Sequence, residues 1–195
     1  MRPWLELALI HYPVLNRQGE TIGSAITNLD LHDLARTART FGLRRYWLVT
    51  PFAEQQQIVR EIVSHWREGY GATANPDRGE ALGLIRVCAC LEEAVSAINR
   101  ELGTERVTVV ATCAREGIRQ DCLSCAAMRD QLGQGRPFLL LFGTGWGLAP
   151  EVLAAVDAVL PPIRGADAYN HLPVRAAAAI MLDRLMGDWR EAPAR

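Results

Sequence analysis

Short apolar runs alternate along the chain with segments in which apolar residues recur every three or four positions. The run over 5–10 is apolar and bounded by turn residues, whereas the runs over 106–112 and 138–142 are unbroken and rich in valine or leucine. Unbroken runs of this length are typical of parallel strands that are covered on both faces. We therefore predict that these segments are buried strands and that the last two lie at the centre of a sheet.

Helical spacing follows the first strand. Residues with N-cap chemistry at 27–30 precede an apolar repeat that Gly42 ends, and the repeat consists of Leu31, Leu34, Ala35, Ala38 and Phe41. The remaining pattern predicts strands over 45–50, 85–89 and 158–160, helices over 53–66, 91–102, 123–132, 150–155 and 174–186, and loops over 69–83 and 161–170. This alternation predicts an α/β fold, a mostly parallel sheet with helices on both faces.

Composition and length favour a single compact domain over residues 1–195. The 195 residues are 49% hydrophobic, which is enough to bury a core without metals or disulfides. The N-terminus has no export signal, and no stretch approaches a membrane span, so we expect a cytoplasmic protein without a membrane partner. The chain contains no lysine, which excludes a lysine-based phosphate loop and Schiff-base chemistry.

Charge favours selective rather than indiscriminate nucleic-acid binding. The net charge of −1 argues against a protein that coats nucleic acid through its overall charge. Four arginines nevertheless gather within ten residues, and these are Arg36, Arg39, Arg44 and Arg45. They predict either a local basic face or, more simply, a solvated helix surface.

Five cysteines, an odd number without an export signal, are best interpreted as reduced thiols. Cys122 and Cys125 form a CxxC pair, but it follows a loop rich in charge, whereas a redox CxxC normally opens a helix after a strand. No second CxxC or nearby histidine completes a tetrahedral zinc site. We therefore expect no metal and regard a redox role as the weakest alternative.

The first candidate ligand segment is the glycine-rich loop over 143–147, directly after the strand over 138–142. Glycines allow backbone to approach a flat or charged ligand closely and to adopt positive φ. In an open α/β sheet, ligands bind beyond the carboxyl ends of the strands. The loop lies too late in the chain for a Rossmann fingerprint, although its glycines alone fit a nucleotide site or a packing turn about equally well.

A second candidate segment runs from 160 to 185. A proline-stiffened loop crowds polar groups next to a helix start, and these are Arg164, Asp167, Tyr169, Asn170 and His171. Such crowding favours a functional site, whereas the plain alternative is a polar loop before a core helix. Asp167, Asn170 and His171 are the candidates for proton handling and substrate orientation, since an imidazole can titrate near neutrality.

These segments together resemble a known family. FGTGWGLAPEV and PIRGADAYNHLPVRAAAAIMLDRL look like the second and third motifs of the SPOUT RNA methyltransferases, and TNLDLHDLARTARTFGL looks like their first. HYPVLN, SHWREGYGATANPDR and YNHLPVR are similar to a bacterial group of SPOUT proteins found alone or fused to tRNA guanine-N1 methyltransferase. The similarity spans nearly the whole chain, from Leu7 to Leu185.

The resemblance implies a C-terminal trefoil knot and S-adenosylmethionine bent among three knot loops over 112–115, 143–147 and 163–174. The residues that it assigns to the cofactor are Thr112, Cys113, Gly143, Thr144, Gly145, Gly147, Ile163, Tyr169, Leu172 and Val174. It also implies an RNA substrate, either tRNA or rRNA, and a homodimer formed through the knot, for which the small-residue helix over 176–185 is a candidate contact. The alternative for this helix is intramolecular core.

The resemblance further places a catalytic arginine at Arg36, beside the target nucleotide. An RNA surface is expected at Arg36, Arg39, Arg44, Arg45 and Arg164. The sequence lacks both the Ser-Leu-Asn segment of 2′-O-methylating relatives and the Asp-Tyr-Val-Leu segment of guanine-N1 enzymes, so the target atom stays undetermined. The competing hypotheses are a non-catalytic protein that binds S-adenosylmethionine or RNA on the same fold, and an unrelated nucleotide-binding α/β module.

Overall fold

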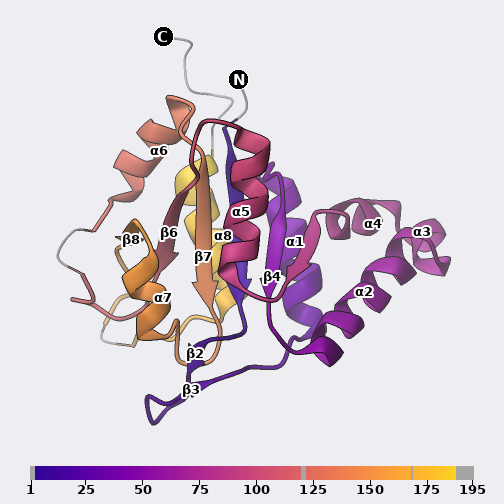
Figure 1. The fold of residues 1–195 in the computed structure, drawn as a ribbon, viewed down its shortest axis with the longest axis horizontal. Coiled ribbons are helices and arrows are strands. Elements are labelled where there is room, and N and C mark those ends of the chain that lie inside the picture. Colours follow the sequence, from indigo (N-terminus) through magenta and orange to yellow (C-terminus); the bar gives the residue numbers. More distant parts are fainter. Residues whose placement is uncertain (1–2, 120–121, 168, 188–195) are drawn as a thin grey trace.

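The computed structural model describes residues 3–119, 122–167 and 169–187, and these build a six-stranded sheet with helices on both faces (Figure 1). The sheet has the order β5-β4-β1-β7-β6-β8, and all its strand pairs are parallel. Its strands are β1 (Leu5–Ile10), β4 (Tyr46–Val49), β5 (Ile85–Cys88), β6 (Thr108–Thr112), β7 (Phe138–Gly143) and β8 (Ala158–Leu160). A short antiparallel hairpin of β2 (Val14–Leu15) and β3 (Thr21–Ile22) follows β1.

The centre of the sheet is the pair of β1 and β7. Their residues pair from Leu5 with Phe138 to Ile10 with Gly143, and every residue of β1 is buried. Alternate residues of β1 enter two separate core clusters, with Leu7 and Leu9 on one face and Ala8 and Ile10 on the other. The prediction of buried strands covered on both faces is therefore confirmed, and β7 is central as predicted. The prediction that 106–112 also lies at the centre is wrong, because β6 is second from the edge, between β7 and β8.

The helices are divided between these two faces. They are α1 (Asn28–Thr40), α2 (Ala53–Arg67), α3 (Tyr70–Ala74), α4 (Pro76–Leu82), α5 (Leu91–Leu102), α6 (Cys125–Gly133), α7 (Pro150–Ala155) and α8 (Val174–Met186). Residues of α1, α2, α4, α6 and α8 enter the core cluster on one face, and residues of α5 and α7 enter the cluster on the other. Thr27 caps α1 as predicted, because its side chain accepts a hydrogen bond from the Asp30 amide.

The prediction of a loop over 69–83 is wrong, because this segment forms α3 and α4 in the structure. The Asn75 side chain accepts a hydrogen bond from the Arg78 amide and Pro76 occupies the first turn, so residues that looked like turn signals start a helix. Gly71 and Gly79 lie against Trp66 of α2, where a Cβ atom would come within 3 Å of it. The glycines thus permit close helix packing, and Figure 1 shows α2 to α4 projecting to one side of the sheet.

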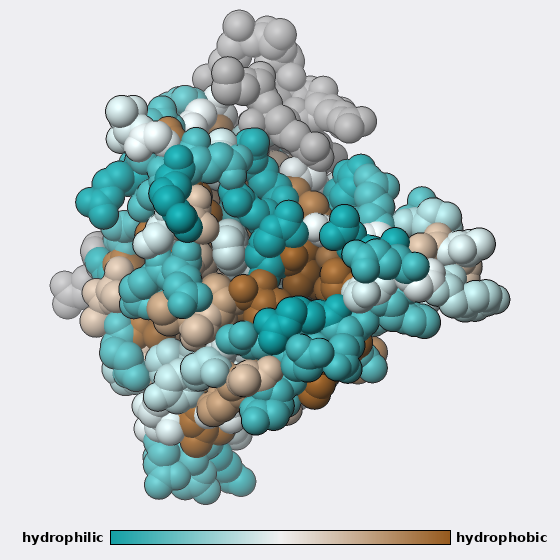
Figure 2. All heavy atoms as spheres, turned by 45° about the vertical axis from the view of Figure 1, so that its right-hand side comes forward, coloured by the Kyte–Doolittle hydropathy of each residue, from teal (hydrophilic) through white to brown (hydrophobic). Residues whose placement is uncertain are grey.

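One face of the molecule is mainly hydrophilic. Figure 2 shows most of this surface in teal, with a cluster of hydrophobic residues near its centre. Within the described residues, no helix combines the length and the apolar character that a membrane span requires.

Candidate cofactor and active site

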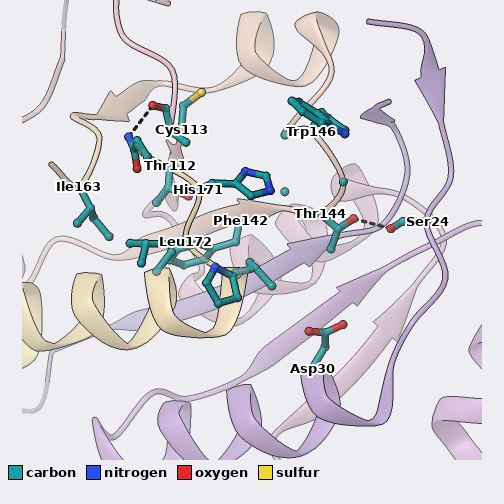
Figure 3. A pocket seen from close by; sticks show the side chains of 18 of the residues that line it. Ser24, Asp30, Thr112, Cys113, Phe142, Thr144, Trp146, Ile163, His171 and Leu172 are labelled. Carbon is teal, nitrogen blue, oxygen red and sulfur yellow. Dashed lines mark hydrogen bonds between the residues drawn. The ribbon is translucent and has the colours of Figure 1, made fainter. Parts of the chain in front are cut away.

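A cavity of about 730 Å³ opens at the carboxyl ends of β1, β6 and β7. Three loops and the start of α1 line it, and Figure 3 shows side chains from all four converging on one space. Nine of the ten residues that the family resemblance assigned to the cofactor line this cavity, namely Thr112, Cys113, Gly143, Thr144, Gly145, Gly147, Ile163, Leu172 and Val174. Tyr169, the tenth, is exposed beside it.

Backbone geometry explains the glycines of the loop over 143–147. Gly145 and Gly147 have φ values of 58° and 103°, which lie in the left-handed region. A Cβ atom on Gly145 would lie 2.8 Å from the Leu15 carbonyl oxygen, so the loop can only pack this closely on β2 without a side chain there. Two hydrogen bonds of 2.9 Å, Trp146 N to Leu15 O and Leu15 N to Gly147 O, join the loop to β2. The loop is therefore a fixed backbone wall of the cavity.

The rest of the lining suits a nucleoside that carries no phosphate group. Phe142, Ile163, Leu172, Val174 and Met181 form an apolar wall, while hydroxyl and amide groups lie along the loops. Apolar walls and exposed backbone groups are what an adenine ring needs, and no phosphate has to be neutralised. The lining residues thus fit S-adenosylmethionine.

A buried histidine supports one side of the cavity. His11 Nδ1 lies 3.0 Å from Ser24 Oγ, and Ser24 Oγ lies 2.5 Å from Thr144 Oγ1. The Thr144 hydroxyl also donates to the Ile10 carbonyl at 3.1 Å, so a chain of hydrogen bonds joins His11, Ser24 and Thr144 to the end of β1. Burial lowers the pKa of His11 to about 4, an effect that nearby Asp30 partly opposes, so His11 is neutral near pH 7.

Asp30 is the one carboxylate among the described residues that line the cavity. The Thr27 hydroxyl donates to its Oδ2 at 2.6 Å, and Arg175 Nη1 lies 3.4 Å from its Oδ1. Arg175 also pairs with Asp33 at 3.2 Å and so connects α8 to α1 at the edge of the cavity. Sequence reasoning missed Ser24 and Asp30, since the one sequence signal was the Thr27–Asp30 spacing, interpreted as a helix cap.

The four catalytic candidates are only partly brought together. Asn170 and His171 line the cavity, and the Asn170 side-chain amide donates to the Ala114 carbonyl at 2.9 Å. Asp167 does not line it, because it is exposed and accepts a hydrogen bond from the Tyr169 amide. Arg36 is exposed on α1, two turns after the residues that reach the cavity, and it does not line the cavity either.

The arginines of the expected RNA surface lie in different places. Arg44 and Arg45 precede β4, at the amino ends of the strands and thus at the edge opposite the cavity. Arg45 pairs with the fully buried Glu6 at 2.9 Å, and Arg44 stacks on the Trp4 ring at 3.7 Å. Arg39 is exposed on α1 and pairs with Glu80 of α4.

Arg164 lies on the cavity side of the molecule. It is exposed in the loop before α8 and pairs with Glu116 of the loop after β6 at 3.0 Å. This pair and the hydrogen bond from Asn170 to Ala114 hold the segment over 163–173 across the loop that follows β6. Two of the three loops of the cavity are thus joined directly.

The cysteines do not form disulfides in the described structure. Cys125 begins α6 and is half-buried against the core, and this burial raises the pKa of its thiol, while Cys122 is exposed. Burial also raises the pKa of Cys88 to about 12. No cluster of three or more His, Cys, Asp or Glu side chains suited to a metal ion occurs among the described residues.

Comparison with known proteins places the chain in a family. A family model described as SAM-dependent RNA methyltransferase matches residues 4–187. An uncharacterized protein from Aquifex aeolicus is 37% identical over 180 residues, which cover 92% of this chain and 86% of that protein. The chain belongs to the SAM-dependent RNA methyltransferase family, in agreement with its resemblance to SPOUT proteins.

A further relative carries a more specific name. A tRNA (guanine-N(1)-)-methyltransferase from Oleidesulfovibrio alaskensis is 46% identical over 184 residues, which cover 94% of this chain and 42% of that protein. The chain therefore spans less than half the length of this relative.

Among solved structures, the SpoU methyltransferase AviRb from Streptomyces viridochromogenes, in complex with AdoMet, has a TM-score of 0.59 at 16% identity. The match covers 100% of this chain and 60% of AviRb. The predicted fold class, an α/β fold with a parallel sheet and helices on both faces, is confirmed by the observed topology, and AviRb shares this fold. The C-terminal trefoil knot stays a prediction.

Proposed function

We propose that this chain transfers the methyl group of S-adenosylmethionine to RNA, with tRNA or rRNA as the substrate. The observation that carries the proposal is the cavity at the carboxyl ends of β1, β6 and β7, which combines a glycine backbone wall with an apolar wall and one carboxylate. Membership of a SAM-dependent RNA methyltransferase family supports the same reaction. The name of the Oleidesulfovibrio alaskensis relative supports tRNA as the first substrate to test.

S-adenosylmethionine, when bound, supplies a methyl group on a sulfonium. The chain's own part is to hold the reactants in line and to accept the proton that a ring nitrogen or hydroxyl loses. The loop over 143–147 and the apolar wall of Ile163 and Leu172 orient the cofactor and keep water out. Asp30 joins His171 as a candidate for accepting the proton, because both line the cavity, whereas Asp167 lies outside it and is the weaker candidate. Asn170 and His171 are the candidates for orienting the target nucleotide.

The RNA surface is proposed on the cavity side of the molecule. Arg36 and Arg164 are exposed, with Arg36 on the helix that starts at the cavity and Arg164 on a cavity loop. Arg39 can join them if its pair with Glu80 opens, since an exposed ion pair contributes little stability. Arg44 and Arg45 lie at the opposite edge and serve this surface least, because Arg45 already compensates the buried Glu6.

The proposal includes a homodimer, a single domain and a cytoplasmic location where RNA is available. Met181, Leu182 and Leu185 of α8 pack in the core of the same chain, so their apolar face is intramolecular. A dimer contact is better supplied by exposed apolar side chains near the cavity end, such as Leu29 at the start of α1 and Phe52 before α2. Both core clusters share one sheet, which supports one domain.

Two measurements test the function. Calorimetric titration with S-adenosylmethionine and with its demethylated product should show binding of both, and binding of neither would contradict the assignment of the cavity. Mixing the protein, labelled cofactor and RNA from a strain that lacks the gene should then transfer label to RNA. Cofactor binding without transfer would favour the alternative, a non-catalytic binding protein on this fold, and mass spectrometry of nucleosides from the two strains identifies the modified base.

A further inference from the structure

An aromatic row lies exposed at the mouth of the cavity. It consists of Trp146, His171 and Tyr169 and is named here the aromatic rim. Trp146 is 53% exposed and Tyr169 is 76% exposed, and His171 between them is exposed as well. Figure 3 shows Trp146 and His171 on one side of the cavity and Asp30 on the other. Large aromatic residues usually bury most of their surface, so an exposed row beside a ligand cavity requires an explanation.

The backbone holds Trp146 in its exposed position. The residue stands between Gly145 and Gly147, whose positive φ angles turn the chain on each side of it. Its amide donates to the Leu15 carbonyl at 2.9 Å, and the Gly147 amide donates to the Thr144 carbonyl at 3.0 Å. A residue fixed in this way does not reach the surface through loop mobility, and its indole is presented to solvent by ordered structure.

The rings of the aromatic rim touch in sequence from two different loops. The centroids of Trp146 and His171 lie 5.8 Å apart with the planes tilted by 39°, and those of His171 and Tyr169 lie 6.5 Å apart edge to face. The Trp146–His171 separation leaves no room for a third ring between them. A planar ligand would therefore stack on the outer surface of the row, next to the cavity, and would not intercalate.

We infer that the aromatic rim stacks an unpaired RNA base and thereby places the target nucleotide over the cavity. Sequence-specific and single-strand RNA recognition commonly relies on bases stacked on aromatic side chains, because every base has a flat apolar face. Trp146 and His171 also line the cavity, so a base on the rim lies beside the bound cofactor. The inference rests on the proposed function and makes the substrate a loop, bulge or single strand in preference to a continuous duplex.

The central experiment compares Trp146→Ala, Trp146→Phe and Tyr169→Ala with the control Tyr70→Ala. Tyr70 is 80% exposed on α3, away from the cavity lining, and thus matches the exposure of Tyr169 without its position. With tRNA from a strain lacking the gene, KM should rise by roughly 5- to 100-fold in Trp146→Ala, the effect of losing one stacked base. The Trp146→Phe protein should retain most of the affinity, and Tyr70→Ala should match the parent protein.

Three results would overturn the inference. The first is an unchanged KM in both Trp146→Ala and Tyr169→Ala while they remain folded by circular dichroism. The second is weakened S-adenosylmethionine binding by calorimetry in Trp146→Ala at an unchanged KM for RNA, which would assign the ring to the cofactor. The third is a change from dimer to monomer by sedimentation in either variant, which would make the rim a contact between copies of the chain.

Direct RNA binding separates this inference from the proposed reaction. A single-stranded RNA dodecamer and the corresponding duplex are titrated into the parent protein and Trp146→Phe, and tryptophan fluorescence is recorded. Stacking should quench the parent protein with the single strand and quench Trp146→Phe much less, whether or not label is transferred. Equal quenching in the two proteins, or preference for the duplex, contradicts stacking on Trp146, while failure of label transfer alone contradicts only the proposed reaction.

Discussion

The hydroxyl oxygens of Ser24 and Thr144 lie 2.5 Å apart, although 120 residues separate them in the chain. Ser24 belongs to the segment between β3 and α1, and Thr144 belongs to the loop over 143–147. The contact therefore joins the N-terminal wall of the cavity to its glycine wall. His11 lies behind Ser24 and completes the connection from the buried core.

Removing the Ser24 hydroxyl should weaken cofactor binding. In Ser24→Ala the Kd for S-adenosylmethionine is expected to rise about 2- to 10-fold, because one neutral hydrogen bond stabilises a structure by about 0.5–1.5 kcal/mol. Calorimetry measures the change, and Thr144→Val provides the second arm of a double-mutant cycle. If the two hydroxyls act as a unit, the double variant loses less than the sum of the single losses, and a strictly additive loss would contradict the coupling.

His11 should make stability depend on pH. Its pKa is about 4 in the fold against 6.5 in the unfolded chain, because burial disfavours the charged imidazole. The unfolded state thus binds more protons between these values, so the contribution of His11 is complete above pH 6.5 and is lost as the pH falls toward 4. The loss amounts to about 3 kcal/mol. Urea unfolding of the parent protein and of His11→Gln, measured from pH 7.5 to 4.5, checks the prediction.

The His11→Gln protein controls for the carboxylates that titrate in the same range, since it contains all of them. Its free energy of unfolding should fall less steeply below pH 6.5 than that of the parent protein. Parallel curves for the two proteins would show that His11 is not the group responsible.

Gly145→Ala should damage the cavity through the backbone. Its φ of 58° disfavours a side chain, and a Cβ atom would collide with the Leu15 carbonyl. Gly103→Ala is the matched control, because Gly103 has a φ of 75° but no atom within 4 Å of the new Cβ. Both variants should lose about 1 kcal/mol or more of stability from strain. Only Gly145→Ala should weaken S-adenosylmethionine binding, by tenfold or more, and equal cofactor Kd values in the two variants would contradict the proposed loop contact.

Most of the fold could be predicted because local patterns agree with the tertiary structure. The strands over 5–10 and 158–160 and the helices over 91–102, 150–155 and 174–186 have the predicted bounds. The short hairpin of β2 and β3 was not predicted, and the larger exception is 69–83, where the sequence Asn75-Pro76 carries the signals of both a turn and a helix start. Packing of Gly71 and Gly79 against Trp66 selects the helix, and no local pattern contains that information.

The site was predictable only where its residues form a continuous loop. The loops over 143–147 and 163–174 contain crowded glycines and polar groups, and they meet at the cavity. Ser24 and Asp30 come from a segment whose polar residues look like an ordinary helix cap. They reach the cavity only because the tertiary structure packs α1 beside the carboxyl ends of β1 and β7. The ion pairs could not be predicted from the sequence either, since Arg45 pairs with the buried Glu6, which lies 39 residues earlier in the chain.

Arg36→Ala tests the arginine that the first motif assigns to the nucleotide. Label transfer to RNA should fall about 10²-fold with cofactor affinity unchanged, because misplacing a reactant by even a small distance has an effect of this size. Arg100→Ala is the control, as Arg100 is exposed on α5 against the opposite face of the sheet. Transfer at the parent rate in Arg36→Ala would refute the catalytic role and return this residue to an ordinary surface charge.

Asp30 and Asp33 allow the proton acceptor to be tested with a closely matched pair. Both carboxylates contact Arg175, but the Asp30 side chain is 8% exposed and lines the cavity, whereas the Asp33 side chain is 46% exposed and does not. If Asp30 accepts the proton that the target nitrogen or oxygen loses as the methyl group arrives, Asp30→Asn should lower kcat by about 10²- to 10⁴-fold and leave cofactor affinity nearly unchanged. Asp33→Asn removes the other partner of Arg175 and should change kcat little. A rise in the Kd for S-adenosylmethionine in Asp30→Asn, at unchanged kcat, would instead show that this carboxylate holds the amino group of the cofactor. Equal losses of kcat in both variants would show that the contact with Arg175 is responsible for the effect.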